Sequence, residues 1–121
     1  MKLEKVKCNF SVCKLSNLEQ IDLSRPYVFL SITLDEISLV CASECVPANA
    51  IEVECGWKAL RVAGVLDFSL IGIVAKISGI LAEVDISIFV VSTYDTDYIL
   101  LKSENFDRAI AALSVSGYDV D

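Results

Sequence analysis

The sequence predicts a mixed α+β fold, in which strands alternate with two helices in the second half of the chain. Three segments lead to this prediction. Residues 70–84 repeat apolar side chains with helical spacing, residues 86–93 form an apolar run of strand length, and residues 104–116 show a second helical pattern. With 121 residues, the chain has the length of one compact domain or of two very small units.

The first half predicts four short strands and no long helix. Its first segment alternates apolar and polar side chains, which is typical of a half-buried strand. The break at Arg25-Pro26 precedes a second strand, because the residue before a proline avoids the helical region, and Asp35-Glu36 supplies a hairpin turn. The expected strands are residues 6–12, 27–34, 37–42 and 51–55, with one helical turn near 18–21 and an irregular segment at 43–50.

The second half predicts the order strand, helix, strand, strand, helix, strand. Asp67 or Ser69 can cap the first helix by accepting hydrogen bonds from its first amides. Ser103 is suited to cap the second helix, and Gly117 to end it. The strand after the first helix is apolar on both faces and therefore needs cover on both sides. The expected elements are residues 57–64, 70–84, 86–93, 98–102, 104–116 and 118–120.

This order is the ferredoxin-like βαββαβ arrangement. The first half looks like the same order with shortened helices, since its hairpin at 27–42 precedes the hairpin at 86–102 by about 60 residues. We interpret this spacing as a degenerate internal duplication, with residues 1–55 and 56–121 as its two halves. Because each half is too small to be stable alone, the two are expected to pack as one body.

The charge of the chain argues against two classes of partner. The formal net charge is −7 and the isoelectric point is about 4.5, so nucleic-acid phosphates and anionic membrane surfaces are repelled. Hydrophobic residues make up 55% of the chain and the mean hydropathy is +0.59, which is more apolar surface than so short a chain can bury. A partner subunit, in a homodimer or a higher homo-oligomer, is therefore expected.

An apolar run from 66 to 91 is long enough to suggest a membrane span. Asp67, Lys76, Glu83 and Asp85 interrupt it, and each is costly in hydrocarbon, so we interpret the run as a core helix followed by a core strand. The first residues lack the apolar segment of a signal peptide, which indicates the cytoplasm.

Five cysteines and no histidine limit the metal and redox chemistry. The odd number and the lack of an export signal argue against a disulfide framework. Cys41 and Cys45 have a C-x-x-x-C spacing, which is weak support for zinc because no second pair accompanies it. Buried thiols that act as small hydrophobic groups are the better interpretation, and we expect neither a metal nor a cofactor. The cysteines are Cys8, Cys13, Cys41, Cys45 and Cys55.

No catalytic constellation stands out in the sequence. Without histidine the usual general base near neutral pH is missing, and the nucleophile-elbow, P-loop and dinucleotide-binding motifs are absent. Asp95 and Asp97 form a carboxylate pair at a turn: either both belong to a solvated turn, or Asp97 accepts from a ligand ammonium group or a cationic side chain. We therefore predict that the protein is not an enzyme; an enzyme that uses these carboxylates alone is the least favoured alternative.

The loop from Gly64 to Ser69 predicts a second part of a binding site. Gly64 permits close backbone approach, and free amides at the start of the following helix attract an anion such as a carboxylate. Helix-start amides near an aspartate match the two charges of an α-amino acid; the alternative is an ordinary strand-to-helix loop with a capping aspartate. Trp57 and Phe89 could stack on a ligand, but such residues more often belong to a core or a subunit interface.

Four stretches of the second half resemble ACT domains. They are Gly56 to Val62, Leu66-Asp67-Phe68-Ser69, Ile86 to Phe89, and Ser92 to Leu100. The resemblance is closest to small stand-alone proteins with tandem ACT-like halves, which are similar to the regulatory domains of aspartate kinase and to the cytosolic arginine sensors of animals. It implies a ferredoxin-like fold with two tandem ACT-like halves, the first degenerate, that binds a ligand without catalysis.

The resemblance also implies where a ligand lies. In such families an amino acid binds at the interface between two ACT units, which pair side by side. The backbone of residues 88–90 would hold the main chain of the ligand, and Asp97 would meet a positive group. One wall of this site would be Gly64, Val65, Leu66, Asp67, Phe68 and Ser69. The other wall would be Ile88, Phe89, Val90, Ser92, Thr93 and Asp97.

Two hypotheses about function follow. The first is a cytoplasmic regulatory module that binds an amino acid, dimerises and has an enzyme as its partner. The second is a structural dimerisation or docking protein with no small-molecule ligand, which the excess of apolar residues and the two-faced strand at 86–93 fit equally well. A strand left unpaired at the edge of the sheet would discriminate between them. The sequence does not specify which amino acid binds.

Overall fold

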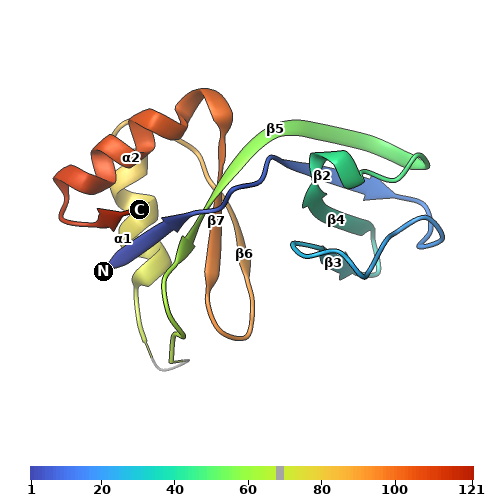
Figure 1. Cartoon of the computed structure of the whole chain (residues 1–121), viewed down its shortest axis with the longest axis horizontal. Coiled ribbons are helices and arrows are strands. Elements are labelled where there is room, and N and C mark those ends of the chain that lie inside the picture. The colour runs from blue at the N-terminus through green and yellow to red at the C-terminus, as the bar shows by residue number, and fades with distance from the viewer. Residues whose placement is uncertain (68–69) are drawn as a thin grey trace. The chain divides into compact units, whose positions relative to one another are not determined.

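A computed structural model describes residues 1–67 and 70–121, which form two compact units. The helical unit comprises Met1–Lys7 and Lys58–Asp121, and the small unit comprises Cys8–Trp57. Strand β5 (Ala50–Val62) contributes residues to both units (Figure 1). The division into halves at 1–55 and 56–121 stays a prediction; the compact units differ from it because the first seven residues belong with the second half.

The helical unit has the predicted βαββαβ order. Its strands lie in the spatial order β6, β7, β5, β1 and β8, with β1 (Lys2–Lys5) antiparallel to β5 and parallel to β8. Both helices lie on the same face of these strands (Figure 1). The elements after β5 are α1 (Ile73–Ala82), β6 (Phe89–Ser92), β7 (Asp97–Lys102), the 3-10 helix η2 (Ser103–Asn105), α2 (Phe106–Val115) and β8 (Asp119–Val120).

The single strand expected at residues 6–12 is wrong. The structure has β1 before this region and β2 (Phe10–Leu15) at its end, with residues 6–9 between them. The side chains keep alternating through the break, so the pattern cannot locate it. Strand β1 completes the sheet of the helical unit, where the amide of Val6 also donates to the carbonyl oxygen of Ala59 at 3.0 Å.

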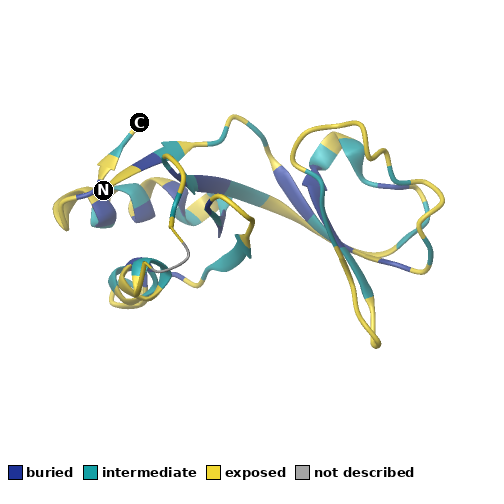
Figure 2. Cartoon of the chain, turned by 90° about the horizontal axis from the view of Figure 1, so that it is seen from below, coloured by how far each residue is buried: buried dark blue, intermediate teal, exposed yellow. Residues whose placement is uncertain are grey.

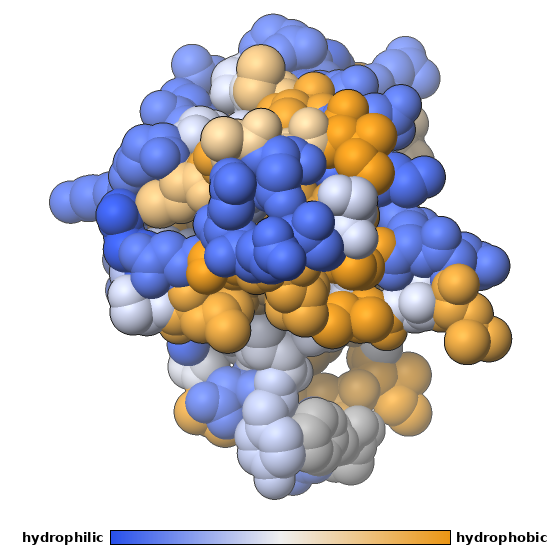
Figure 3. Space-filling view, turned by 90° about the vertical axis from the view of Figure 1, so that its right-hand side faces the viewer, coloured by the Kyte–Doolittle hydropathy of each residue, from blue (hydrophilic) through white to orange (hydrophobic). Residues whose placement is uncertain are grey.

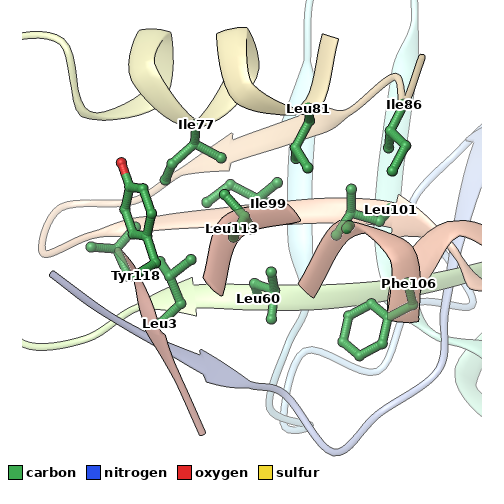
Figure 4. Packing of buried hydrophobic residues seen from close by; sticks show 12 residues of the cluster. Leu3, Leu60, Ile77, Leu81, Ile86, Ile99, Leu101, Phe106, Leu113 and Tyr118 are labelled. Atoms are coloured by element: carbon green, nitrogen blue, oxygen red, sulfur yellow. The ribbon is translucent and has the colours of Figure 1, made fainter. Parts of the chain in front are cut away.

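The apolar faces of the two helices and the sheet form the core of the helical unit. Ile77 and Leu81 of α1 and Leu113 of α2 are fully buried, as the helical spacing predicts. Burial of such a side chain stabilises the fold by about 1.5–3 kcal/mol relative to exposure. Figure 2 shows the alternation of buried and exposed residues along the chain. These three side chains pack with Leu3, Leu60, Ile86, Ile99, Leu101, Phe106 and Tyr118 (Figure 4).

The ends of the helices differ from the prediction by two or three residues at three of four places, and by one residue at the end of α2. Helix α1 begins at Ile73 rather than 70, and its N-cap is Gly72 with φ 79°, without a side-chain cap. Asp67 therefore lies too far upstream to cap it, and Ser69 is outside the described residues. Helix α1 ends at Ala82 instead of 84, and α2 begins at Phe106 after η2, so Ser103 is not its N-cap.

The end of α2 confirms the role predicted for Gly117. This glycine has φ 99°, in the left-handed region that side chains with a Cβ disfavour. The amide of Gly117 donates to Ser114 O at 3.1 Å, and the amide of Tyr118 donates to Leu113 O at 3.1 Å. This pair of hydrogen bonds is a Schellman motif, which satisfies the last carbonyls of the helix and turns the chain toward β8.

The small unit has the same strand order as a ferredoxin-like half, with loops in place of its helices. Its order is β3 (Phe29–Ile32), β4 (Ile37–Ala42), β2 and the first part of β5, and within 8–57 only the 3-10 helix η1 (Ser43–Cys45) is helical. The helical turn expected near 18–21 is a turn of the loop. Cys13, Leu15, Leu39 and Cys41 form the core, with loop residues Ile21, Val28 and Val46 against it.

Strand β5 replaces two predicted strands, at 51–55 and 57–64. Gly56 suggests an interruption, and its φ is indeed 84°. The chain accommodates it as a bulge: Phe10 pairs with Trp57 but Val12 pairs with Glu54, so the register shifts by one residue between these pairs. The strand continues through the bulge, and the sequence pattern alone does not distinguish a bulge from a turn.

The hairpins of the two units repeat each other with residue numbers that differ by 60. Strands β3 and β6 have corresponding bounds, as do β4 and β7 and the 3-10 helices that follow them. Phe29 pairs with Val40, and Phe89 pairs with Leu100, so the registers also correspond. The spacing read from the sequence is thus matched by geometry, which supports the two-half architecture.

Candidate functional site

A hollow of about 390 Å³ lies at one end of the helical unit. The loop between β5 and α1, the first turn of α1 and the turn between β6 and β7 surround it, and Figure 1 shows that loop and hairpin reach the same end of the unit. Its lining residues are Leu66, Asp67, Leu70, Gly72, Ile73, Val74, Ala75, Ser92, Thr93, Tyr94, Asp95, Thr96 and Asp97.

Two hydrogen bonds join the loop and the hairpin turn that form the walls of this hollow. The amide of Leu66 donates to the carbonyl oxygen of Asp95 at 2.6 Å. The hydroxyl of Thr96 donates to the carbonyl oxygen of Val62, the last residue of β5, at 2.7 Å. Thr96 is only 4% exposed, so this second bond is shielded from water.

Thr93 shapes the turn that presents the carboxylates. Its amide and its hydroxyl both donate to the carbonyl oxygen of Thr96, at 2.8 and 3.0 Å. These bonds close the turn over Tyr94 and Asp95, which are exposed, while Asp97 begins β7 opposite Ser92 and is half-buried. The turn therefore places two carboxylates, of Asp95 and Asp97, beside the hollow.

The start of α1 supplies hydrogen-bond donors to the same hollow that the carboxylates of the turn line. The first intrahelical bond is that from Lys76 N to Gly72 O, so the amides of residues 73–75 have no acceptor within the helix. The first turn contains no acidic side chain, and all three residues line the hollow. Helix-start amides attract an anion, and the aspartates attract a cation. The described lining contains no lysine or arginine, so this geometry suits a ligand with both charges.

The structure brings together part of the predicted site. Leu66, Asp67, Ser92, Thr93 and Asp97 line the hollow, whereas Phe68 and Ser69 lie outside the described residues. Contact of any of these residues with a ligand stays a prediction. The predicted residues that do not line the hollow are Gly64, Val65, Ile88, Phe89 and Val90.

The absence of residues 88–90 from the lining has a simple physical reason. In the part of the chain that the structure describes, β6 is an edge strand whose one partner is β7, with Phe89 opposite Leu100 and Val90 opposite Ile99. Ser92, at the end of this strand beside the turn, lines the hollow, whereas residues 88–90 lie toward the other end of the strand and away from the hollow.

Sequence reasoning missed most of the helix start and the middle of the hairpin turn. Helix α1 begins later than its apolar pattern, and the glycine at 72 was the available signal for that boundary. Thr96 was not singled out because a lone threonine in a turn gives no sign that it is buried. The missed lining residues are Leu70, Gly72, Ile73, Val74, Ala75, Tyr94, Asp95 and Thr96.

In the sequence, the cysteines are also candidate metal ligands or buried apolar groups. Among residues 1–67 and 70–121, no group of three or more cysteine, aspartate or glutamate side chains is arranged to hold a metal ion. Cys13 and Cys41 are buried in the small unit, where burial raises the pKa of both thiols, that of Cys41 to about 12. Protonated thiols are poor nucleophiles and metal ligands near neutral pH, so these two act as apolar core groups.

The surface retains apolar side chains despite the two cores. Figure 3 shows hydrophobic groups between hydrophilic ones on the face that it presents. Within the helical unit, Val65, Ile71 and Tyr94 are 76%, 95% and 81% exposed, and all three lie on the segments that surround the hollow. No helix among the described residues has both the length and the apolar character needed to cross a membrane.

Comparison with known proteins identifies relatives of this chain. A model of the ACT domain family matches residues 52–115. Among solved structures, protein Atu0741 of Agrobacterium tumefaciens is 29% identical and superposes with a TM-score of 0.86, over 99% of this chain and 91% of that one. Protein VC0802 of Vibrio cholerae, described as a possible transport protein, is 21% identical with a TM-score of 0.77, over 92% of this chain and 85% of that one.

The fold also occurs as part of larger enzymes. Aspartate kinase of Synechocystis is 19% identical with a TM-score of 0.65, and the match covers 99% of this chain but 27% of the kinase. Aspartate kinase of Clostridium acetobutylicum, described as an allosteric enzyme, matches with a TM-score of 0.60 at 16% identity, over 92% of this chain and 32% of that one. At these identities the likeness to the kinases shows a shared fold.

Proposed function

Because the chain belongs to the ACT domain family, whose members are generally regulatory, we propose that it is a non-catalytic regulatory module that binds an amino acid in the hollow of the helical unit. The observation that supports this proposal best is the pairing of free helix-start amides with carboxylates across one hollow. A zwitterion offers the complementary charges, and no catalytic group is needed to bind it.

The proposed ligand lies with its carboxylate at the amides of residues 73–75. Its ammonium group, or a cationic side chain, lies toward Asp95 and Asp97. Asp97 is the more favourable acceptor of the two because it is half-buried, where a charge interaction is less screened than on the exposed Asp95. Thr93 and Ser92 add hydroxyl groups along the same wall.

A second ACT-like unit completes the site in this proposal. The hollow is open, and edge strand β6 carries the predicted residues Ile88, Phe89 and Val90 on or beside it. A paired unit would cover both, giving a homodimer or a higher homo-oligomer in the cytoplasm with an enzyme as the regulated partner. A ligand that contacts both units stabilises the joined state, so occupancy and association are coupled.

A thermal-shift screen against the twenty amino acids tests the proposal. A ligand that binds only the folded state raises the melting temperature by mass action. We expect a concentration-dependent rise with one or a few amino acids, and a shift toward larger species by analytical ultracentrifugation at the same concentrations. If no amino acid shifts the melting temperature at millimolar concentration, the amino-acid site is refuted.

The edge strand β6 favours one alternative, a dimerisation or docking protein without a small-molecule ligand. Its residues Phe89, Val90 and Val91 are half-buried, and the segments nearby expose apolar side chains. Stable dimers that form without any amino acid, together with a flat thermal-shift screen, would support this function. Replacing Val91 with lysine should then separate the subunits, because a charge on an edge strand opposes pairing.

A further inference from the structure

We infer that Thr96 is a positioning residue, whose hydroxyl holds the carboxylate-bearing turn against the loop that forms the other wall of the hollow. The positioning itself is independent of any ligand, and its effect on binding rests on the proposed function. Among the described residues, Thr96 and Ser11 are the two buried polar residues. A buried hydroxyl is costly unless it is hydrogen-bonded, and Thr96 meets this need across two different segments.

The hydrogen bond from Thr96 reaches the point where the loop begins. Its acceptor, Val62 O at 2.7 Å, belongs to the last residue of β5, and the loop starts at the next residue. The neighbouring residue Asp95 accepts the amide of Leu66 at 2.6 Å, farther along the same loop. The turn is thus fixed to the loop at two places, one buried and one half-exposed, with Thr96 making the buried bond.

The position of Thr96 also determines where the acidic side chains lie. Asp95 precedes it and Asp97 follows it, so displacement of Thr96 moves both carboxylates relative to the amides of residues 73–75. The carbonyl oxygen of Thr96 accepts both donors of Thr93, which ties the closing bonds of the turn to the same residue. Thr96 itself does not need to contact the ligand to affect its binding.

The corresponding turn of the small unit shows that forming the turn and attaching it to β5 are separate roles. There Thr33 donates through its amide and hydroxyl to the carbonyl oxygen of Glu36, at 3.0 and 3.3 Å. The turn has the same form, yet Glu36, in the place of Thr96, is exposed. A threonine at 96 is therefore not required to form the turn. The specific role of Thr96 is to hold the turn against β5 through its hydrogen bond to Val62 O.

Hydrogen exchange at Leu66 tests the positioning without any ligand. We expect Thr96→Val, which keeps the shape of the side chain but removes the donor, to speed exchange of the Leu66 amide about tenfold relative to the unchanged core amide of Leu101. Thr96→Ser restores the donor and should restore protection, and Thr33→Val in the small unit should leave Leu66 unaffected. Unchanged exchange at Leu66 in a folded Thr96→Val protein would overturn the inference.

A measurement on the wild-type protein keeps the inference testable if Thr96→Val does not fold. A buried, hydrogen-bonded hydroxyl proton exchanges slowly enough to be observed by NMR at low temperature. We expect such a signal for Thr96 with a cross-peak to protons of Val62, and none for the exposed Thr33. Fast exchange of the Thr96 hydroxyl proton would contradict the hydrogen bond from Thr96 to Val62 O.

Binding of L-lysine, followed by isothermal titration, then tests the consequence for the site. If L-lysine or another amino acid that stabilises the wild type binds, Thr96→Val should weaken its affinity about tenfold and Thr96→Ser should recover it, at similar melting temperatures. Equal affinity in Thr96→Val and wild type would overturn the positioning role. If no amino acid binds the wild type, the proposed function fails, while the exchange of Leu66 still decides the structural part.

Discussion

The β3–β4 and β6–β7 hairpins have the same register and the same threonine-closed turn, but they differ at the two residues that follow the turn. Glu36 and Ile37 in the small unit correspond to Thr96 and Asp97 in the helical unit. The closing bonds come from Thr33 and Thr93, which both hairpins retain. The comparison therefore separates residues that build the turn from residues that give it chemical function.

The units also differ in what covers their sheets. In the helical unit, α1 both completes the core and supplies free amides beside the turn. In the small unit, the loop at residues 16–28 occupies the equivalent place in the chain, and it contributes Ile21 and Val28 to the core. The small unit has thus kept a strand order and a core without a helix start, and it has Ile37 in the place of Asp97, so the proposed site belongs to one half alone.

The largest expected effect tests the difference between the cores. Leu113→Ala, at a fully buried position between α2 and the sheet, should lower the free energy of unfolding by about 2–5 kcal/mol, because rigid elements close the cavity only partly. Leu39→Ala, buried in the small unit, should cost less, since loops rather than helices cover it and can relax inward. Urea denaturation measures both, and equal losses would show that the loops are as rigid as the helices.

The sequence predicted those features that leave a periodic or positional signal. The spacing of Ile77, Leu81 and Leu113 predicted their burial, and Gly117 marked the end of α2. The repeat of the hairpins was visible because strand length and turn residues recur after a fixed interval. These signals are local in the sequence, so they can be recognised without knowledge of the tertiary contacts.

The rest depends on contacts between distant segments. The insertion of β1 beside β5 is set by backbone pairing, which leaves no mark on side-chain alternation. The bulge at Gly56 keeps β5 continuous at a glycine where the sequence pattern is equally compatible with a turn. The role of Thr96 arises from a hydrogen bond across 34 residues to Val62, and threonine is common in turns for purely local reasons.

The next effect concerns ligand affinity at Asp97, where the hairpin of the small unit has the uncharged Ile37. If a cationic amino acid binds, Asp97→Ala should weaken its affinity about tenfold or more, because a half-buried partner of the ammonium group is lost. Asp35→Ala, on the turn of the small unit, is the matched control and should leave affinity unchanged. Isothermal titration compares them; equal losses in both variants would place the site elsewhere.

At alkaline pH, the thiol of Cys41 is expected to lower the free energy of unfolding by about 1 kcal/mol. Burial, and next the neighbouring Cys13, raises the pKa of Cys41 to about 12. The unfolded thiol loses its proton near pH 9 while the folded one retains it, so the stability from this group is complete below pH 9 and declines between pH 9 and 12.

Comparison of wild type with Cys41→Ala isolates this contribution. Between pH 7 and pH 9.5 the wild type should lose about 1 kcal/mol more of its free energy of unfolding than the variant does. Cys55→Ala, which changes an exposed residue, serves as the control for the loss of a thiol. Parallel pH profiles for wild type and Cys41→Ala would mean that the small unit admits water to its core.

The smallest expected effects test α1, the helix that the small unit lacks. Gly72 has φ 79° at the N-cap, so Gly72→Ala should destabilise the protein by about 1 kcal/mol even though an added Cβ meets nothing within 4 Å. Gly79 lies inside the helix with the same open space, and there alanine should stabilise by about 0.5–1 kcal/mol. In thermal denaturation, a lower melting temperature for Gly72→Ala and a higher one for Gly79→Ala would locate the helix start at Gly72. A stabilising Gly72→Ala would instead mean that the helix extends toward residue 70, in which case the free amides of residues 73–75 would be bonded within the helix and unavailable to a carboxylate.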